Sequence, residues 1–351
     1  MRKGLVLAAC ALALAIPSAA IADVAHVGYP SSMASTGDSI TRAFNTCGFP
    51  FIDCPQNSWS TGTSSTVNSH YRRILASNPA ISGRNFNGAK TGARMNGLAA
   101  QVTTVVSQNA EYVTILMGAN DVCTSSVATM TPTATLESQL QAALQSLSSG
   151  LPNTRIYVVS IPNVYHLWEI LHTNFSAIVT WTIGGICQSL LANPTSTAPA
   201  DVARRKQVYD RNVADNQALS RVCAGFIHCR FDGGAAFNLQ FVRSDVSTRD
   251  YFHPAVAGQA KAAAVTWGAT FDFSDQTAPT SYADRVANPV SGTDVTLTAT
   301  DNVGVSGIEY RLNGSAYRRY TGTFTVATGT AVTYRAVDVN GNVEATHPLI
   351  G

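Results

Sequence analysis

Charged side chains are scarce in this 351-residue chain, in which Asp, Glu, Lys and Arg together make up 13% of the residues. Hydrophobic residues make up 45%, so the composition predicts a folded chain with a large core and excludes a disordered one. If an N-terminal leader carrying Arg2 and Lys3 is removed, 21 basic and 21 acidic residues remain. The sequence therefore lacks the basic surface of a nucleic-acid-binding protein, and we expect no nucleic-acid partner.

The apolar run near the N-terminus, residues 4–16, is too short to span a bilayer. It follows the basic start Met1-Arg2-Lys3 and precedes Ala20-Ile21-Ala22, which has the small-x-small pattern of a cleavage site. These three features are typical of a secretory signal peptide. We therefore expect residues 1–22 to be a signal peptide that is cleaved after Ala22. The mature protein should then be extracellular, without a transmembrane segment.

The cysteines lack the spacing of a common zinc site. No Cys-x-x-Cys or His-rich pattern is present, so we expect no metal. Cys10 leaves with the leader, and the six cysteines that remain favour three disulfides in an oxidising compartment. Six cysteines allow 15 connectivities, which sequence alone leaves open. Short loops favour Cys47–Cys54 and Cys223–Cys229, and this choice leaves Cys123–Cys187.

Strand and helix patterns alternate from residue 24 to residue 266. The continuous apolar runs 112–117 and 155–161 are typical of strands buried on both faces, whereas 133–148 and 200–224 have helical periodicity. Further helices are expected over 67–77, 92–108, 164–191 and 254–266, and further strands over 24–36, 85–89 and 226–231. This alternation predicts an α/β body, residues 23–274, with a mainly parallel sheet covered by helices on both faces. The loops after Thr36, Ala89 and Met117 should then meet at one edge of the sheet.

The composition changes at residues 275–279, a polar segment that ends in Pro279 and that we expect to be a linker. Beyond it, apolar residues alternate with period two, and Asn313-Gly314 and Asn340-Gly341 are strong turn signals. Residues 280–351 are therefore predicted to form a small all-β sandwich domain.

The first loop of the α/β body contains Gly37-Asp38-Ser39, directly after an expected strand. Glycine allows a sharp bend that leaves Ser39 at the tip, where it can act as a nucleophile if a base reaches it. Taken alone, this stretch is an ordinary turn. The same is true of three further motifs, Asn87–Gly92, Gly118–Asp121 and Asp250–Pro254, when each is considered by itself.

Together these motifs supply the groups that acyl transfer needs. His253 can take the proton of Ser39, and Asp250, three residues before it, can hold the second imidazole nitrogen. The developing oxyanion needs hydrogen-bond donors. The Ser39 N–H, the N–H of a helix-opening Gly92 and the Asn120 side-chain amide are the candidates.

In this order the motifs resemble those of the SGNH (GDSL) hydrolase family of serine esterases and lipases, over about residues 31–268. The matching residues are Gly37-Asp38-Ser39, Gly92, Gly118-x-Asn120-Asp121 and Asp250-x-x-His253. The resemblance implies a flavodoxin-like three-layer α/β/α sandwich with a five-stranded parallel sheet and no cofactor. It also implies that Ser39 is the nucleophile, His253 the base and Asp250 the orienting carboxylate. Ser39, Gly92 and Asn120 would form the oxyanion hole.

The tail resembles the small immunoglobulin-like β domains appended to secreted bacterial hydrolases, through Tyr334–Asp338 and Gly341-Asn342. This resemblance implies a role in attachment to a cell surface or glycan, or in spacing. His228 lies in an expected strand beside Cys229, and we interpret it as structural.

The expected function is that of a secreted serine carboxylester hydrolase that forms an acyl-enzyme on Ser39. Lipid or phospholipid acyl esters are the favoured substrates, because the cysteine-rich loop up to Thr66 and the apolar segment 164–191 could line an acyl pocket. Segment 164–191 is equally compatible with plain core helix. Removal of acetyl groups from a polysaccharide is the alternative reaction. A secreted binding or adhesion protein that keeps the fold without turnover is the alternative class of function.

Overall fold

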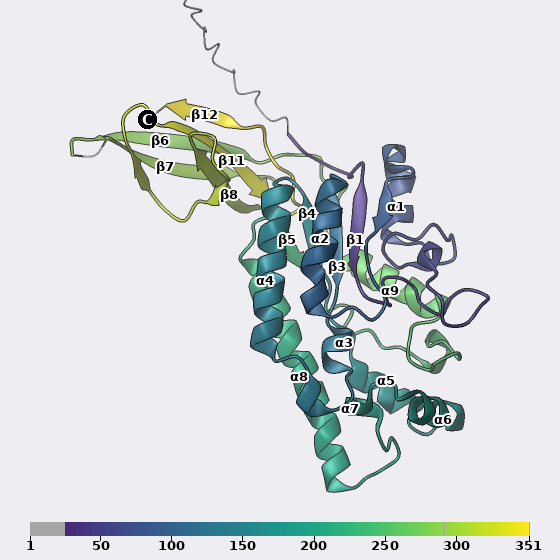
Figure 1. Cartoon of the computed structure of the whole chain (residues 1–351). Coiled ribbons are helices and arrows are strands. Elements are labelled where there is room, and N and C mark those ends of the chain that lie inside the picture. The colour runs from purple at the N-terminus through teal and green to yellow at the C-terminus, as the bar shows by residue number, and fades with distance from the viewer. Residues whose placement is uncertain (1–24, 291, 351) are drawn as a thin grey trace, which may run out of the picture.

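The computed structural model describes residues 25–290 and 292–350, and the expected signal peptide lies outside these residues (Figure 1). Its first part is built on a five-stranded parallel sheet with the strand order β2-β1-β3-β4-β5. The strands are β1 (Met33–Gly37), β2 (Asn85–Asn87), β3 (Tyr112–Leu116), β4 (Arg155–Val158) and β5 (Cys229–Phe231). The predicted α/β fold with a parallel sheet is therefore confirmed.

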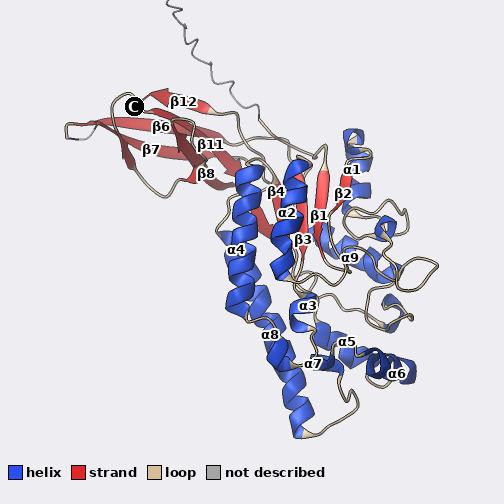
Figure 2. Ribbon diagram, in the orientation of Figure 1, coloured by secondary structure: helices blue, strands red, loops and turns tan. Residues whose placement is uncertain are grey.

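Helices cover both faces of this sheet (Figure 2). They are α1 (His70–Ser77), α2 (Leu98–Ser107), α4 (Thr133–Gly150), α8 (Pro199–Ala224) and α9 (Val256–Ala269). Val113 and Ile115 of β3 pack in one apolar cluster with α2, α4 and α8. Tyr112 and Leu116 of the same strand pack in another cluster with α1 and α9. The period-two alternation of strand side chains thus gives a three-layer sandwich in which β3 is buried on both faces.

Two expected helices differ in the structure. The helix expected over 92–108 begins only at Leu98, and Gly92 lies in a turn with φ +78° before it. The segment 164–191 forms three short helices, α5 (Val164–Leu171), α6 (Phe175–Gly184) and α7 (Gln188–Leu191). Gly185, in the left-handed conformation with φ +59°, ends α6. These three helices share a separate apolar cluster with Val122 and Val246, beyond the carboxyl ends of the strands.

The C-terminal part is all β, as predicted, and consists of two antiparallel sheets with the orders β10-β7-β6 and β12-β11-β8-β9. The strands are β6 (Thr280–Asn288), β7 (Gly292–Thr300), β8 (Val305–Leu312), β9 (Arg318–Arg319), β10 (Phe324–Val326), β11 (Ala331–Asp338) and β12 (His347–Ile350). Alternate residues of these strands, including Val295, Leu297, Ile308 and Val332, form a small core of their own.

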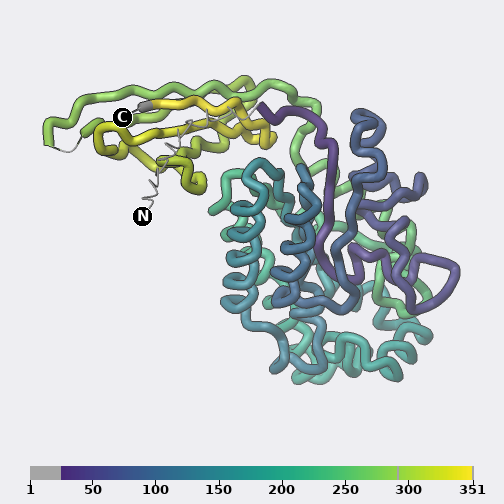
Figure 3. Tube along the Cα trace, turned by 45° about the horizontal axis from the view of Figure 1, so that its top comes forward, coloured from purple at the N-terminus to yellow at the C-terminus, as the bar shows by residue number. Residues whose placement is uncertain are grey.

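A buried arginine joins the two parts. The guanidinium of Arg155, at the start of β4, donates hydrogen bonds to the carbonyl oxygens of Gly28 and Gly341 and to the side-chain oxygen of Asn342. Because Arg155 is at the amino end of its strand, the β sheets attach to the edge opposite the carboxyl ends. Figures 1 and 3 show the β sheets at the end of the body away from α5–α7.

Candidate active site

Ser39 lies at the carboxyl end of β1, in the sharp turn that follows Gly37. Gly37 has φ +147°, and a Cβ at this position would lie 2.4 Å from the carbonyl oxygen of Leu116 on the neighbouring strand. Only glycine fits here without a shift of the backbone. The buried side chain of Gln101 holds the turn, since it accepts from the Gly37 N–H at 2.8 Å and donates to the Gly37 carbonyl at 2.9 Å.

The structure brings Ser39, His253 and Asp250 into direct contact. The Oγ of Ser39 lies 2.7 Å from Nε2 of His253. Nδ1 of the same imidazole lies 2.6 Å from Oδ2 of Asp250. The other carboxylate oxygen of Asp250 accepts from the backbone N–H groups of Phe252 and His253, both at 3.0 Å. The side chains thus form a continuous chain from hydroxyl to imidazole to carboxylate across more than 200 residues of sequence.

Asp250 is buried, with 4% of its surface exposed. Burial alone would raise the pKa of its carboxyl group, but the hydrogen bonds and charge of His253 and the Phe252 N–H outweigh burial and lower the pKa below its usual value. Asp250 therefore stays ionised, and an ionised partner on Nδ1 orients the imidazole with Nε2 toward the serine.

The pKa of Asp38, the residue before the serine, is shifted in the opposite direction. Its carboxyl is fully buried, and burial raises its pKa to about 7 against the opposing effects of the Ile40 N–H and His253. One oxygen accepts from the Ile40 N–H at 2.9 Å, whereas the other has no hydrogen-bond partner among the described residues. Asp250 is therefore the site's more readily ionised carboxylate.

The loops after β2 and β3 place hydrogen-bond donors beside the serine. Asn120 is in α3 (Ala119–Val122), and its side-chain amide donates to the Ala93 carbonyl at 2.9 Å, which ties it to the Gly92 turn. The Lys90 N–H in turn donates to the Gly37 carbonyl at 3.1 Å. Neither the Ser39 N–H nor the Gly92 N–H donates to another described residue. Gly92 does not open a helix as expected, but its loop lies where the sequence predicted.

His253 borders two hollows, and Ser39 lines the first of them. A narrow cavity of about 70 Å³, with room for about five water molecules, is lined mainly by apolar side chains. They include Ile40, Leu116, Val164, Leu167, Leu239 and Phe252. An open groove of about 630 Å³ reaches His253, Asp250 and Asn120 and is bordered by the Cys47–Cys54 loop and α6. The segment 164–191 therefore contributes to these walls through α5 and α6, and is not only core.

Two residues of the site were not identified from the sequence. The side-chain amide of Asn45 donates to Oδ2 of Asp250 and its carbonyl oxygen accepts from the Phe51 N–H, so Asn45 joins the Cys47–Cys54 loop to the carboxylate. The ring of Phe44 lies 4.9 Å from that of His253. Neither residue belongs to one of the four motifs, and no local pattern marks a contact across 205 positions.

The six cysteines among the described residues form three disulfides, which are the two pairs favoured by short loops and the pair that this choice leaves. Cys47–Cys54 closes the loop beside the groove. Cys123–Cys187 connects the end of α3 to the start of α7, so it holds the Asn120 loop against the helices that border the groove. Cys223–Cys229 links α8 to β5, away from the site.

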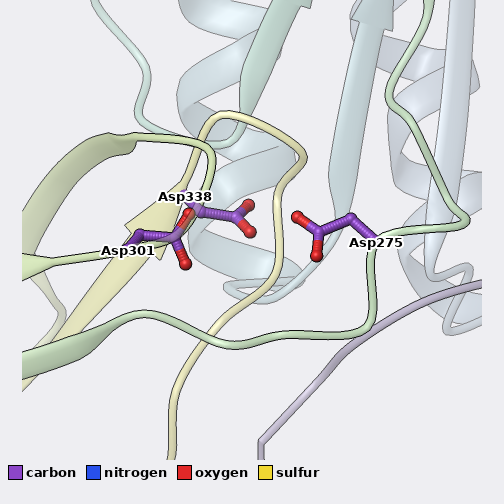
Figure 4. A group of neighbouring side chains, drawn as sticks. All are labelled: Asp275, Asp301 and Asp338. Atoms are coloured by element: carbon purple, nitrogen blue, oxygen red, sulfur yellow. The ribbon is translucent and has the colours of Figure 1, made fainter.

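A group of three acidic side chains, Asp275, Asp301 and Asp338, lies where the two parts of the chain meet (Figure 4). Their carboxylates are close enough to share a cation, but they have other partners. Asp338 accepts from the Asn340 and Asn342 N–H groups and from the Asn342 amide. Asp275 accepts from Asn340 and the Thr277 N–H. These bonds brace the Asn340–Asn342 turn. Asp301 accepts from the Val303 and Gly304 N–H groups through Oδ1, and its Oδ2 has no hydrogen-bond partner among the described residues. The cluster lies at the end of the body opposite Ser39.

Comparison with known proteins identifies the family of the chain. The model of the GDSL-like lipase/acylhydrolase family matches residues 36–261, well over half of the chain. An extracellular lipase from Streptomyces rimosus has a similar structure at 18% identity, with 68% of this chain and 99% of that chain covered and a TM-score of 0.42. A phospholipase A1 from Streptomyces albidoflavus is 16% identical, with 70% of this chain and 100% of that chain covered and a TM-score of 0.40. A family two carbohydrate esterase from Clostridium thermocellum is 13% identical, with 68% of this chain and 62% of that chain covered and a TM-score of 0.38. No curated protein matches the chain. Among the described residues, no helix has the length and apolar character needed to cross a membrane.

Proposed function

Because the chain belongs to the GDSL-like lipase/acylhydrolase family of ester hydrolases, we propose that it is a secreted serine carboxylester hydrolase that acts on lipid or phospholipid acyl esters. The observation that carries the proposal is the contact of Ser39 Oγ with His253 Nε2, together with that of His253 Nδ1 with Asp250. A hydroxyl, a base and an ionised carboxylate in this order are the groups that serine acyl transfer requires.

In the proposed reaction, Ser39 Oγ attacks the ester carbonyl carbon while Nε2 of His253 accepts the hydroxyl proton. The negative oxygen of the tetrahedral intermediate accepts from the N–H groups of Ser39 and Gly92 and from the second N–H of the Asn120 amide. His253 then returns its proton to the leaving alcohol, and the acyl-enzyme remains on Ser39. Water, deprotonated by His253, attacks the acyl group, and the proton passes back to Ser39 as the carboxylic acid leaves. Asp250 keeps its charge throughout and stabilises the imidazolium.

The walls of the two hollows support the lipid substrate class. The narrow cavity beside Ser39 is lined by aliphatic and aromatic side chains, with few polar groups that could bind sugar hydroxyls. The groove beyond it is wide enough for a longer acyl chain or an alcohol group and has Phe44, Phe51, Ile183 and Phe252 along its length. The three disulfides support the proposal of secretion, because such bonds persist in oxidising compartments.

Hydrolysis of p-nitrophenyl esters from acetyl to palmitoyl, with wild type beside Ser39→Ala, tests the proposal. We expect activity that rises beyond acetyl, and a loss in Ser39→Ala on the order of 10⁶ in kcat, because the nucleophile is absent. Activity confined to acetyl would favour polysaccharide deacetylation instead. Folded, oxidised protein without activity on any ester would make a binding protein the better interpretation.

A further inference from the structure

Large apolar side chains are exposed on two segments beside the groove. Phe49 and Phe51 in the Cys47–Cys54 loop are 75% and 68% exposed, and Phe175 and Ile183 in α6 are 79% and 83% exposed. We call these two segments, with Ile52 and Val179, the entrance patch: Phe49, Phe51, Ile52, Phe175, Val179 and Ile183. Exposed apolar residues scattered singly need no explanation, but a group on one rim marks an interaction surface.

Three residues of the entrance patch line the groove that reaches His253. Phe51 contributes to one side of the groove, Val179 and Ile183 contribute to the other, and the groove continues to His253 and Asp250. Figures 1 and 3 place α6 at the end of the body opposite the β sheets. A flat partner that covered the patch would therefore lie directly over the groove and would not meet the C-terminal part.

The charges around the patch indicate the chemistry of that partner. Residues 48–52 and 175–184 contain no Asp, Glu, Lys or Arg. Two cations lie beside them: Arg249 donates to the Cys47 and Gly48 carbonyls at 2.7 Å, and Arg243 donates to the Ile170 carbonyl at 2.7 Å. Neither guanidinium forms an ion pair with a carboxylate of the described residues.

Arg243 and Arg249 also share a hollow of about 290 Å³ with the hydroxyl-bearing residues Ser244, Ser247 and Thr248. The neighbouring carboxylate, Asp245, is buried and pairs with Lys261. Asp53, next to the patch, pairs with Arg42, and Glu169 of α5 contacts His166. Arg243 and Arg249 therefore leave positive charge on this side of the patch that is complementary to phosphate groups. An apolar surface flanked by unpaired arginines matches the two layers of a phospholipid surface, acyl chains below and phosphates above.

We propose that this face docks on a phospholipid surface, with the entrance patch inserted among the acyl chains and Arg243 and Arg249 at the phosphate groups. Docking would place the groove over the lipid, so that an ester could move from the surface to Ser39 without crossing water. The kinetic part of this inference rests on the proposed function, whereas docking itself requires no turnover.

Binding is measured by cosedimentation of Ser39→Ala protein with vesicles of phosphatidylcholine, alone or with a third of phosphatidylglycerol. This background prevents digestion of the vesicles. We expect binding that is stronger to the anionic vesicles, and at least a tenfold weaker affinity for both kinds when Phe49→Asp and Phe175→Asp are added. Val290→Asp is the matched control, because Val290 is 92% exposed in the turn between β6 and β7, at the far end of the molecule. It should bind as the background does.

Two double variants distinguish an effect of the arginine charges on binding from an effect of their hydrogen bonds on the neighbouring backbone. Arg243→Gln with Arg249→Gln should remove the preference for anionic vesicles. Arg243→Lys with Arg249→Lys, which retains both charges, should keep it. Loss of the preference in both pairs would show that the arginines only hold the Cys47–Cys54 loop and the end of α5, and would overturn their proposed role at phosphates.

With Ser39 intact, Phe49→Asp with Phe175→Asp should leave hydrolysis of dissolved p-nitrophenyl acetate unchanged and lower hydrolysis of vesicle lipid at least tenfold. Vesicle binding without hydrolysis of any ester would overturn the proposed function and leave docking in place. Hydrolysis of dissolved esters without vesicle binding would overturn docking alone. A wild-type dimer that dissociates in the Asp variants, with no vesicle binding, would assign the patch to a second copy of the chain and also overturn docking.

Discussion

His70 and His253 both contact hydroxyl groups, but they lie in different regions of the protein and have different partners. His70, in α1 and fully buried behind the sheet, lies 2.9 Å from the Tyr112 hydroxyl through Nδ1 and 2.9 Å from the Thr266 hydroxyl through Nε2. His253 lies at the carboxyl ends of the strands, between the Ser39 hydroxyl and the Asp250 carboxylate. Both hydrogen-bond partners of the His70 side chain are hydroxyl groups, whereas one partner of the His253 side chain is a carboxylate.

That group changes what the imidazole can do. Burial, with a smaller effect of Arg73, lowers the pKa of His70 to about 3, so His70 remains neutral and serves as a link between α1, β3 and α9. At His253, the ionised Asp250 would stabilise an imidazolium that forms during the reaction. The comparison teaches that a histidine between hydroxyls is structural in this protein, whereas a histidine between a hydroxyl and a carboxylate can transfer protons.

The largest effect should come from His253→Ala. We expect kcat for a p-nitrophenyl ester to fall by a factor on the order of 10⁶, because His253 is the base that contacts Ser39 Oγ and no second one does so among residues 25–290 and 292–350. Thermal unfolding, measured in parallel, should show a folded protein. Activity within tenfold of wild type would mean that His253 is not the base.

Asp250→Asn should lower kcat by about 10⁴, because the amide cannot stabilise the imidazolium and favours the wrong tautomer. This variant makes the partners of His253 neutral, as those of His70 are, while retaining the shape of the side chain. Steady-state kinetics at neutral pH, with circular dichroism as the control for folding, measure the effect. A loss of less than tenfold would contradict the role proposed for the carboxylate.

Acid should destabilise the protein through His70. Between pH 6.5 and about 3 the unfolded chain binds a proton at this position and the native chain does not, so the free energy of unfolding falls as the pH falls. The loss over the whole window is roughly 5 kcal/mol. Urea unfolding of wild type and His70→Gln at several pH values checks this. The slope of the stability against pH should be shallower in the variant, and equal slopes would refute the neutral state of native His70.

The smallest effect, and one confined to stability, is expected for His70→Ala. A cavity and two buried hydroxyls that lose a partner should cost about 3 kcal/mol of unfolding free energy. The kcat of the protein that remains folded should be unchanged, in contrast to His253→Ala. Denaturant unfolding and active-site titration separate the two quantities. A fall in kcat per active site would show that the two histidines are coupled across the sheet.

A third histidine shows how far spacing alone can be trusted. His347 also follows a carboxylate by three residues, and its Nε2 lies 3.1 Å from Glu344 in the C-terminal part. The spacing allows a pair in both regions but does not ensure one, because His172 follows Glu169 by three residues and contacts Glu169 only at its backbone carbonyl. At His253, the folded chain also places the Ser39 hydroxyl beside Nε2, and Ser39 follows the distant strand β1. The carboxylate–histidine spacing is thus a local property, and the nucleophile–base contact is a tertiary one.

Much of the α/β fold was determined by local patterns. Continuous apolar runs predicted β3 and β4, and helical periodicity predicted α4 and α8 within one or two residues. The order of the four motifs, read with the rule that parallel strands end at one edge, predicted that Ser39, Asn120 and His253 would meet. These predictions succeeded because hydrophobic periodicity and the connectivity of parallel strands depend on nearby residues.

Tertiary structure alone decided the rest. The helix expected to open at Gly92 begins six residues later, because the intervening segment is held by Asn120 and by the Asp121 side chain, which accepts from the Met95 N–H at 2.9 Å. The support of Asp250 by Asn45 and the meeting of the Cys47–Cys54 loop with α6 along one groove join positions more than 100 residues apart. Such contacts depend on how finished elements pack against each other. No periodicity along the chain encodes them, because each partner's local sequence is satisfied without the other.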